Sequence, residues 1–153
     1  MMRQVLALLG FLVLCLGVGA LGGWATSQAE VEWYPTLVKP SWQPPAWLFG
    51  PVWTVLYIMM AVAAWLVWRA GNARAALMLF GGQLLLNLAW SFLFFGARSP
   101  GLALLDIAAL WLAIAATIFA FSFKSRIAAF MMVPYLCWVS FATALNAAIW
   151  TLN

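Results

Sequence analysis

Histidine is absent from this 153-residue sequence, and charged residues make up only 7% of it. Without histidine the chain lacks the usual general base, the commonest metal ligand and the usual haem axial ligand, which excludes most soluble enzyme chemistries. In soluble domains, roughly a quarter of the residues are charged. The only two cysteines, Cys15 and Cys137, lie in apolar runs and form no disulfide framework. With 68% hydrophobic residues, the composition is that of a membrane protein.

Long uncharged runs predict five membrane-spanning helices, because about 20 helical residues cross a hydrocarbon layer of roughly 30 Å. The runs cover residues 4–24, 47–68, 75–95, 102–123 and 127–150. They are continuously apolar and do not alternate, which favours helices over the strands of a barrel. The first run is too long for a cleaved signal peptide. We therefore expect one all-α membrane domain over 1–153, a five-transmembrane-helix bundle whose single long connection is a loop over 25–46.

The positive charges predict the orientation of the bundle. One side collects five of them: Arg3, Arg69, Arg74, Lys124 and Arg126. The opposite side has only Lys39 and Arg98, so the N-terminus is predicted in the cytoplasm and the first loop and the C-terminus outside. The net charge of +4 then reflects topology and does not indicate nucleic-acid binding.

The first loop combines prolines with aromatic residues, among them Trp33 and Trp42. Because proline fixes φ and restricts the residue before it, this segment is expected to be stiff and extended. Two interpretations remain open. The loop is either a lid over the bundle or a belt of aromatic side chains at the level of the lipid headgroups.

Polar and aromatic residues share single faces of three predicted helices. These residues are Trp53 and Tyr57 in the second, Gln83, Asn87, Trp90 and Phe94 in the third, and Tyr135, Trp138, Ala142 and Asn146 in the fifth. Amides are costly toward lipid, so these faces should point inward. They either tie the helices together or line a flat apolar cavity, and the bulk of the three tryptophans favours the cavity.

Several ordered motifs resemble the tryptophan-rich sensory protein and translocator protein family, once called peripheral benzodiazepine receptors. They are the run Trp-Tyr-x-x-Leu-x-Lys-Pro-x-Trp-x-Pro-Pro over 33–45, Trp-Thr-x-Leu-Tyr over 53–57, Gln-Leu-x-Leu-Asn-x-x-Trp over 83–90, Phe-Phe-Gly-Ala-Arg over 94–98, and Pro-Tyr-x-x-Trp over 134–138 ending in Ala-Thr-x-Leu-Asn over 142–146. The resemblance covers nearly the whole chain.

This resemblance implies a five-helix bundle, often a homodimer in bacteria, with a pocket beneath the first loop that binds porphyrins, sterols or synthetic drugs. The residues carried over are Trp53 and Trp138 as pocket tryptophans, Asn87, Trp90 and Ala142 as the polar wall, and Trp33 and Trp42 as loop aromatics. Two departures matter. The C-terminal segment lacks the Tyr and Lys or Arg of the sterol pattern of animal members, and Leu102 replaces their pocket tryptophan.

The leading hypothesis is a receptor or translocator in a bacterial cell membrane that binds a protoporphyrin-type tetrapyrrole, and possible sterol binding comes second. The macrocycle would stack on Trp53 and Trp138, with its carboxylates near Lys39 and Arg98. No metal or cofactor is expected, and porphyrin is a ligand. An alternative is an enzyme that degrades porphyrin in light with Trp53 and Trp138 as electron donors. A third hypothesis is a proton-coupled exporter that uses Asp106. The structural alternative is that Asp106 interacts with the N-terminal helix dipole or forms an ion pair with Arg98.

Overall fold

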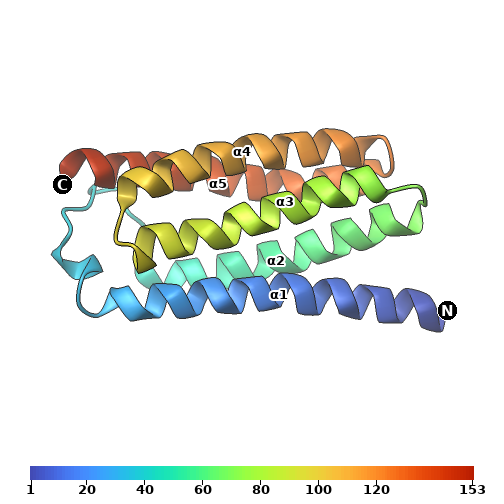
Figure 1. Ribbon diagram of the computed structural model, residues 1–153, viewed down its shortest axis with the longest axis horizontal. Helices are drawn as coiled ribbons and strands as arrows, with labels where there is room; N and C mark the ends of the chain where they lie inside the picture. Colours follow the sequence, from blue (N-terminus) through green and yellow to red (C-terminus); the bar gives the residue numbers. More distant parts are fainter.

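Five long helices run side by side in the computed structural model, which describes all residues from 1 to 153 (Figure 1). The helices are α1 (Met2–Glu30), α2 (Ala46–Arg69), α3 (Arg74–Ser91), α4 (Pro100–Ser122) and α5 (Arg126–Leu152). Each is long and apolar enough to cross a membrane, α3 together with a short extension described below. The expected all-α, five-helix membrane bundle is therefore confirmed.

The first helix is longer than the uncharged run that predicts it. α1 continues past residue 24 to Glu30, so the irregular connection covers only 31–45 and includes one 3-10 turn, η1 (Tyr34–Thr36). The added turns contain neither proline nor glycine, and Ala25 and Ala29, one turn apart, are buried against the bundle. A helix that packs on its neighbours need not end where the membrane does. We call residues 31–45 the lid loop.

A π-helical turn, η2 (Phe92–Gly96), extends α3. It closes with a hydrogen bond of 2.7 Å from the Ala97 amide to the Phe92 carbonyl. Arg98 follows with a φ of 51°, in the left-handed region. The wide turn directs the Phe94 side chain into the bundle, where it is buried. Such π turns are frequent at functional sites.

The helices form a closed ring in which α1 contacts α2 and α3, α2 contacts α5, and α4 packs between α3 and α5. The turns over 70–73, 97–99 and 123–125 are short, so neighbours along the chain are antiparallel. The N-terminus, the α2–α3 turn and the α4–α5 turn share one end of the bundle, which we call the N-terminal end (Figure 1). The lid loop, the α3–α4 turn and the C-terminus share the other, the loop end.

The main cluster of buried residues comes mostly from α2, α3, α4 and α5. Alanines of α2 allow close approach, and Phe80 of α3 stacks on Phe121 of α4 with ring centroids 5.9 Å apart. Tyr135 of α5 is completely buried in the same cluster. Toward the loop end the packing opens into a cavity.

Candidate ligand-binding site

A cavity of about 640 Å³ lies inside the loop end of the bundle. All five helices and the lid loop contribute to its wall. Aromatic side chains dominate that wall: Tyr34, Trp47, Phe49, Trp53, Tyr57, Trp90, Phe94, Phe95 and Trp138. This size and lining are typical of sites for small organic ligands, which measure about 300–1,000 Å³.

Trp53 of α2 is the centre of the aromatic wall. It stacks on Tyr57, one helical turn away, with centroids 5.6 Å apart and an interplanar angle of 29°. It meets Trp138 of α5 edge-on at 6.4 Å and Tyr135 at 6.2 Å. Trp138 in turn contacts Phe49 at 5.7 Å. These edge and stacked contacts fix the ring planes and leave a flat, rigid apolar surface.

A directed chain of hydrogen bonds runs from the cavity lining, at Tyr57 and Asn87, to Tyr135 and Gln83 behind it. The Tyr57 hydroxyl donates to Asn87 Oδ1, Asn87 Nδ2 donates to the Tyr135 hydroxyl at 2.7 Å, and that hydroxyl donates to Gln83 Oε1 at 2.8 Å. All four side chains are buried. The chain joins α2, α3 and α5, and the polar groups satisfy one another, as they must in an apolar interior.

A second set of hydrogen bonds joins α3, α5 and the start of α4. The Trp90 indole nitrogen donates to Asn146 Oδ1 at 2.9 Å, and Asn146 Nδ2 donates to the Pro100 carbonyl at 2.8 Å. Trp90 also stacks on Phe94 at 5.1 Å. Ala142, one turn before Asn146, lines the cavity with a small side chain that leaves room beside these rings.

Two polar atoms of the lining have no partner. Trp138 Nε1, a donor, and Gln43 Oε1, an acceptor, are both buried and unpaired, and both residues line the cavity. An unsatisfied buried polar group costs roughly 1–3 kcal/mol. A ligand that offers one acceptor and one donor would recover that energy, so the cavity is prepared for a mostly apolar molecule with a few polar groups.

Helix α1 closes the cavity through a close approach at Gly19. A Cβ atom at this position would lie 2.8 Å from Cδ2 and Cε2 of Tyr57, well inside van der Waals contact. At Gly23, one turn later, a Cβ atom would meet nothing within 4 Å. Gly19 therefore allows α1 to pack against Tyr57, whereas Gly23 faces open space in the cavity lining.

Of the ten residues expected to bind a ligand, seven line the cavity and three do not. Lining the cavity are Trp53, Tyr57, Asn87, Trp90, Trp138, Ala142 and Asn146, whereas Tyr135 lies behind the wall in the hydrogen-bonded chain. Trp33 and Trp42 do not line the cavity. Their rings pack edge-on against Phe94 at 5.9 Å and Phe141 at 5.8 Å, and so fasten the lid loop to the bundle.

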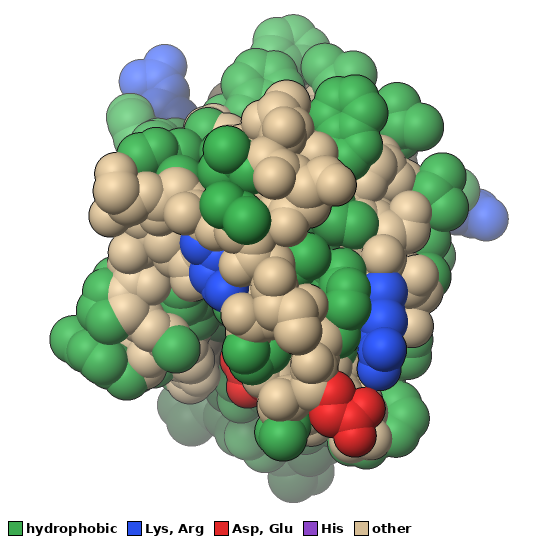
Figure 2. Space-filling model, turned by 90° about the vertical axis from the view of Figure 1, so that its left-hand side faces the viewer, with side chains coloured by type: hydrophobic (Ala, Val, Ile, Leu, Met, Phe, Trp, Pro, Cys, Tyr) green, Lys and Arg blue, Asp and Glu red, His purple; other side chains and the backbone are tan.

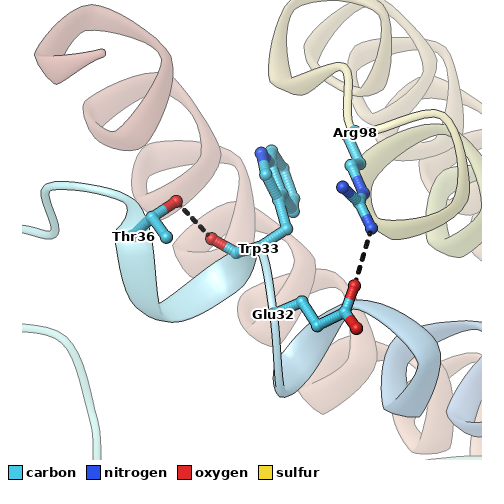
Figure 3. A network of polar contacts seen from close by, with 4 residues as sticks. All are labelled: Glu32, Trp33, Thr36 and Arg98. Carbon is cyan, nitrogen blue, oxygen red and sulfur yellow. Dashed lines mark hydrogen bonds and ion pairs between the residues drawn. The ribbon is translucent and has the colours of Figure 1, made fainter.

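The expected cations also lie outside the lining. Arg98 reaches from the α3–α4 turn to Glu32, with 3.8 Å between Nη2 and Oε2 (Figure 3). Lys39 Nζ donates to the Leu37 carbonyl at 2.9 Å and lies 4.9 Å from the centre of the Tyr34 ring. Figure 2, which views the loop end, shows a few acidic and basic side chains set among apolar and other polar atoms.

Asp106 forms no salt bridge with Arg98, which pairs with Glu32 instead. It also lies beyond the first turn of α4 (Pro100–Ser122), where the helix dipole acts most strongly. Its Oδ2 atom is buried without a partner, and the residue does not line the cavity. Neither expected pairing of this carboxyl group is therefore present.

Hydrogen bonds order the lid loop near its start and hold it in its middle. Near its start, the Thr36 hydroxyl donates to the Trp33 carbonyl at 2.6 Å (Figure 3). In its middle, Asn153 pairs with Val38 twice: the Val38 amide donates to Oδ1 and Nδ2 donates to the Val38 carbonyl, both at 2.9 Å. This pairing connects the loop to the end of α5.

Sequence reasoning missed three lining residues of the lid region: Tyr34, Gln43 and Trp47. Tyr34 and Gln43 lie in the same proline-rich run as the loop tryptophans, so the run itself was the available signal. Burial raises the pKa of the Tyr34 phenol above its ordinary value, which keeps its hydroxyl protonated. Trp47 reads as a membrane anchor from its place at a span end, but it lies at the mouth of the cavity.

Comparison with known proteins gives consistent matches over the whole chain. The sequence model of the TspO/MBR family matches residues 11–151. The chain is 48% identical to the tryptophan-rich protein TspO of Chlorobaculum tepidum, over 100% of this chain and 99% of the relative. It is 44% identical to the translocator protein of Homo sapiens, over 80% and 76%. It is 39% identical to the tryptophan-rich sensory protein of Cereibacter sphaeroides, over 89% and 88%.

Proposed function

Because the chain belongs to the TspO/MBR family of multi-pass integral membrane proteins, we propose that its cavity binds a tetrapyrrole of the protoporphyrin type. The protein would thereby contribute to tetrapyrrole transport, sensing or regulation. One observation carries the proposal: a cavity of about 640 Å³ whose wall is built from fixed aromatic planes. Such planes suit a flat, conjugated macrocycle held by stacking, which needs no metal ligand from the protein.

The unpaired polar atoms define how the ligand would be oriented. Trp138 Nε1 would donate to a carboxylate or carbonyl oxygen, and Gln43 Oε1 would accept from a ligand N–H or O–H group. Lys39 and Arg98 belong to the same end of the bundle and favour anionic substituents at the mouth, while Glu30 in the lining opposes them. A sterol is the competing ligand, since its hydroxyl group could satisfy the same pair, but its aliphatic rings gain less from stacking.

Tryptophan fluorescence quenching would test this proposal. The purified protein is titrated with protoporphyrin, its dimethyl ester and a sterol, and the titrations are repeated with Trp53→Phe and Trp138→Phe. The matched control is Trp111→Phe, whose indole donates to Ser140 Oγ at 2.8 Å outside the cavity. We expect saturable quenching by porphyrin that weakens about tenfold in the two cavity variants and stays unchanged in the control. Equal affinities in all three variants would contradict the assigned site.

A second candidate function is light-dependent degradation of the bound porphyrin. The observation that favours it is the contact series from Trp53 to Tyr57, Tyr135 and Trp138, with centroid distances of 5.6, 6.2 and 6.4 Å. The light-excited porphyrin would take one electron from the adjacent indole and pass it to dissolved dioxygen, giving superoxide. The indole radical cation would then regain an electron from the porphyrin, which is thereby the molecule that is oxidised. Illumination of the complex in air should bleach the porphyrin faster than in empty detergent. Equal decay, unaltered by Trp53→Phe, would exclude this activity.

We also propose that the N-terminal end faces the cytoplasm, since that end carries five of the seven cations. Cysteines introduced at Ser125 and Ser99, in turns at opposite ends, would be labelled with a membrane-impermeant maleimide in intact cells. Labelling at Ser99 alone is expected, and labelling at Ser125 alone would reverse the orientation. Family membership further supports a homodimer, which sedimentation of the detergent-solubilised protein would test.

A further inference from the structure

A second hollow, of about 560 Å³, lies at the N-terminal end of the bundle, remote from the aromatic cavity. Its lining is polar and basic where the aromatic cavity is apolar. Three arginines from three segments contribute to it: Arg3 at the start of α1, Arg69 at the end of α2 and Arg74 at the start of α3. We call this hollow the basic cleft.

The arginines of the basic cleft have no acidic partners. The single salt bridge of the molecule joins Arg98 and Glu32 at the loop end. The remaining acidic residues, Glu30 and Asp106, belong to the C-terminal part of α1 and the N-terminal part of α4, both of which also lead to the loop end. Three positive charges therefore converge on one concave surface without a counter-charge from the protein.

Indole rings hold two of these guanidinium groups in place. Arg3 Cζ lies 5.6 Å from the centre of the Trp68 ring, and Arg69 Cζ lies 4.5 Å from that of Trp65. The Trp65 indole nitrogen is itself fixed by a hydrogen bond of 3.0 Å to the Gln4 carbonyl. Stacking on an aromatic face leaves the N–H edge of a guanidinium group free, and that edge matches the oxygens of a phosphate group.

The backbone at the start of α3 also favours an anion in the basic cleft. Helix α3 begins at Arg74 with no side-chain cap, whereas α5, which starts at the same end of the bundle, is capped by Ser125 through a bond of 3.2 Å to the Ala128 amide. Uncapped amide groups at a helix N-terminus favour an anion. The sharp turn before α3, with φ of 77° at Gly71 and 44° at Asn72, brings that terminus beside the end of α2.

We propose that the basic cleft binds a phosphate group, presented by the headgroup of an anionic phospholipid such as phosphatidylglycerol. A positive-inside bias explains why cations occur at this end, but it does not require that three of them share a hollow and lie against indole rings. The cleft joins the ends of membrane-spanning helices, at the depth where headgroups lie. Basic pockets between helices at that depth are recognised lipid sites.

Native mass spectrometry of the detergent-solubilised protein, titrated with phosphatidylglycerol, would test the site. The test variant is Arg69→Gln with Arg74→Gln. The matched control is Lys124→Gln with Arg126→Gln, which removes the same charge at the same end from residues that do not line the cleft. We expect one retained lipid on the wild-type protein, binding about thirtyfold weaker in the test variant and nearly unchanged in the control.

Titration with ammonium phosphate distinguishes the two sources of the phosphate group. If inorganic phosphate displaces the lipid at equal concentration, the ligand is free phosphate; if it does not, the ligand is the headgroup, and either result supports a phosphate site. Equal weakening in both double variants, or no retained lipid on the wild-type protein, would overturn the proposal. Porphyrin quenching at the opposite end should be unaltered in both variants, which verifies that they are folded.

Discussion

The contact between Gly19 and Tyr57 gives a sharp test of how the cavity wall is built. In Gly19→Ala, the new methyl group would lie 2.8 Å from two Tyr57 ring carbons, whereas ordinary contact begins at 3.4 Å. Helix or ring must therefore move by about 0.6 Å. The ring is not free to swing away, because its hydroxyl donates to Asn87 and its face stacks on Trp53.

Overpacking of this kind typically costs about 1–3 kcal/mol. We therefore expect the free energy of unfolding of Gly19→Ala to be lower than that of Gly23→Ala by that amount, measured by chemical denaturation in detergent followed by circular dichroism. If Tyr57 instead yields toward the cavity, the loss moves to ligand binding, where about 1.4 kcal/mol corresponds to a tenfold weaker porphyrin affinity. Stability and affinity measured together account for the whole cost.

Gly23→Ala is the matched control, because it lies one turn further along α1 and its Cβ atom would meet nothing within 4 Å. Both substitutions gain the same helix propensity, about 0.5–1 kcal/mol. Because both positions line the cavity, it is the difference in their free energies of unfolding that isolates the contact with Tyr57. If the two variants have equal stability and equal porphyrin affinity, α1 does not approach α2 as described.

Three further predictions concern single side chains. Asn153→Ala should release the lid loop, with faster hydrogen exchange at the Val38 amide and several-fold faster porphyrin dissociation. The control Thr151→Ala, which loses only a bond within α5, should change neither rate. Unaltered exchange at Val38 in Asn153→Ala would show that the pairing does not hold the loop. Asn87→Leu removes the central link of the hydrogen-bonded chain and should lower the free energy of unfolding by about 1–3 kcal/mol; a thermal midpoint equal to that of the wild type would contradict the assigned chain. Asp106→Asn should leave porphyrin affinity within a few fold, because Asp106 does not line the cavity, and complete loss of binding would place this carboxyl group in the site.

The architecture was predictable because the length of an uncharged, apolar run is nearly sufficient to identify a membrane-spanning helix. Uncharged runs locate all five helices, and helical spacing directs Gln83, Asn87 and Asn146 inward, where the structure has them buried. The end of α1 was not predictable in this way. Hydropathy marks the membrane boundary, whereas the extension to Glu30 depends on Ala25 and Ala29 packing against the bundle.

The division of roles within the site required three-dimensional contacts. Helical periodicity places Tyr135 and Trp138 on one face, but it cannot tell that Tyr135 bonds to Asn87 behind the wall while Trp138 faces the cavity. Charge counting likewise brings Arg98 to the correct end of the bundle. Its pairing with Glu32 depends on the longer α1, which carries that carboxylate to the α3–α4 turn.

The pairing of Val38 with Asn153 has a consequence for biosynthesis. The two residues are 115 positions apart, so the loop leaves the ribosome long before its partner exists. Until α5 has been inserted, nothing holds the middle of the lid loop over the helices, and the cavity stays open at the loop end. Retention of a ligand would then begin only when α5 is inserted and Asn153 pairs with Val38, so insertion of α5 is the step that closes the cavity.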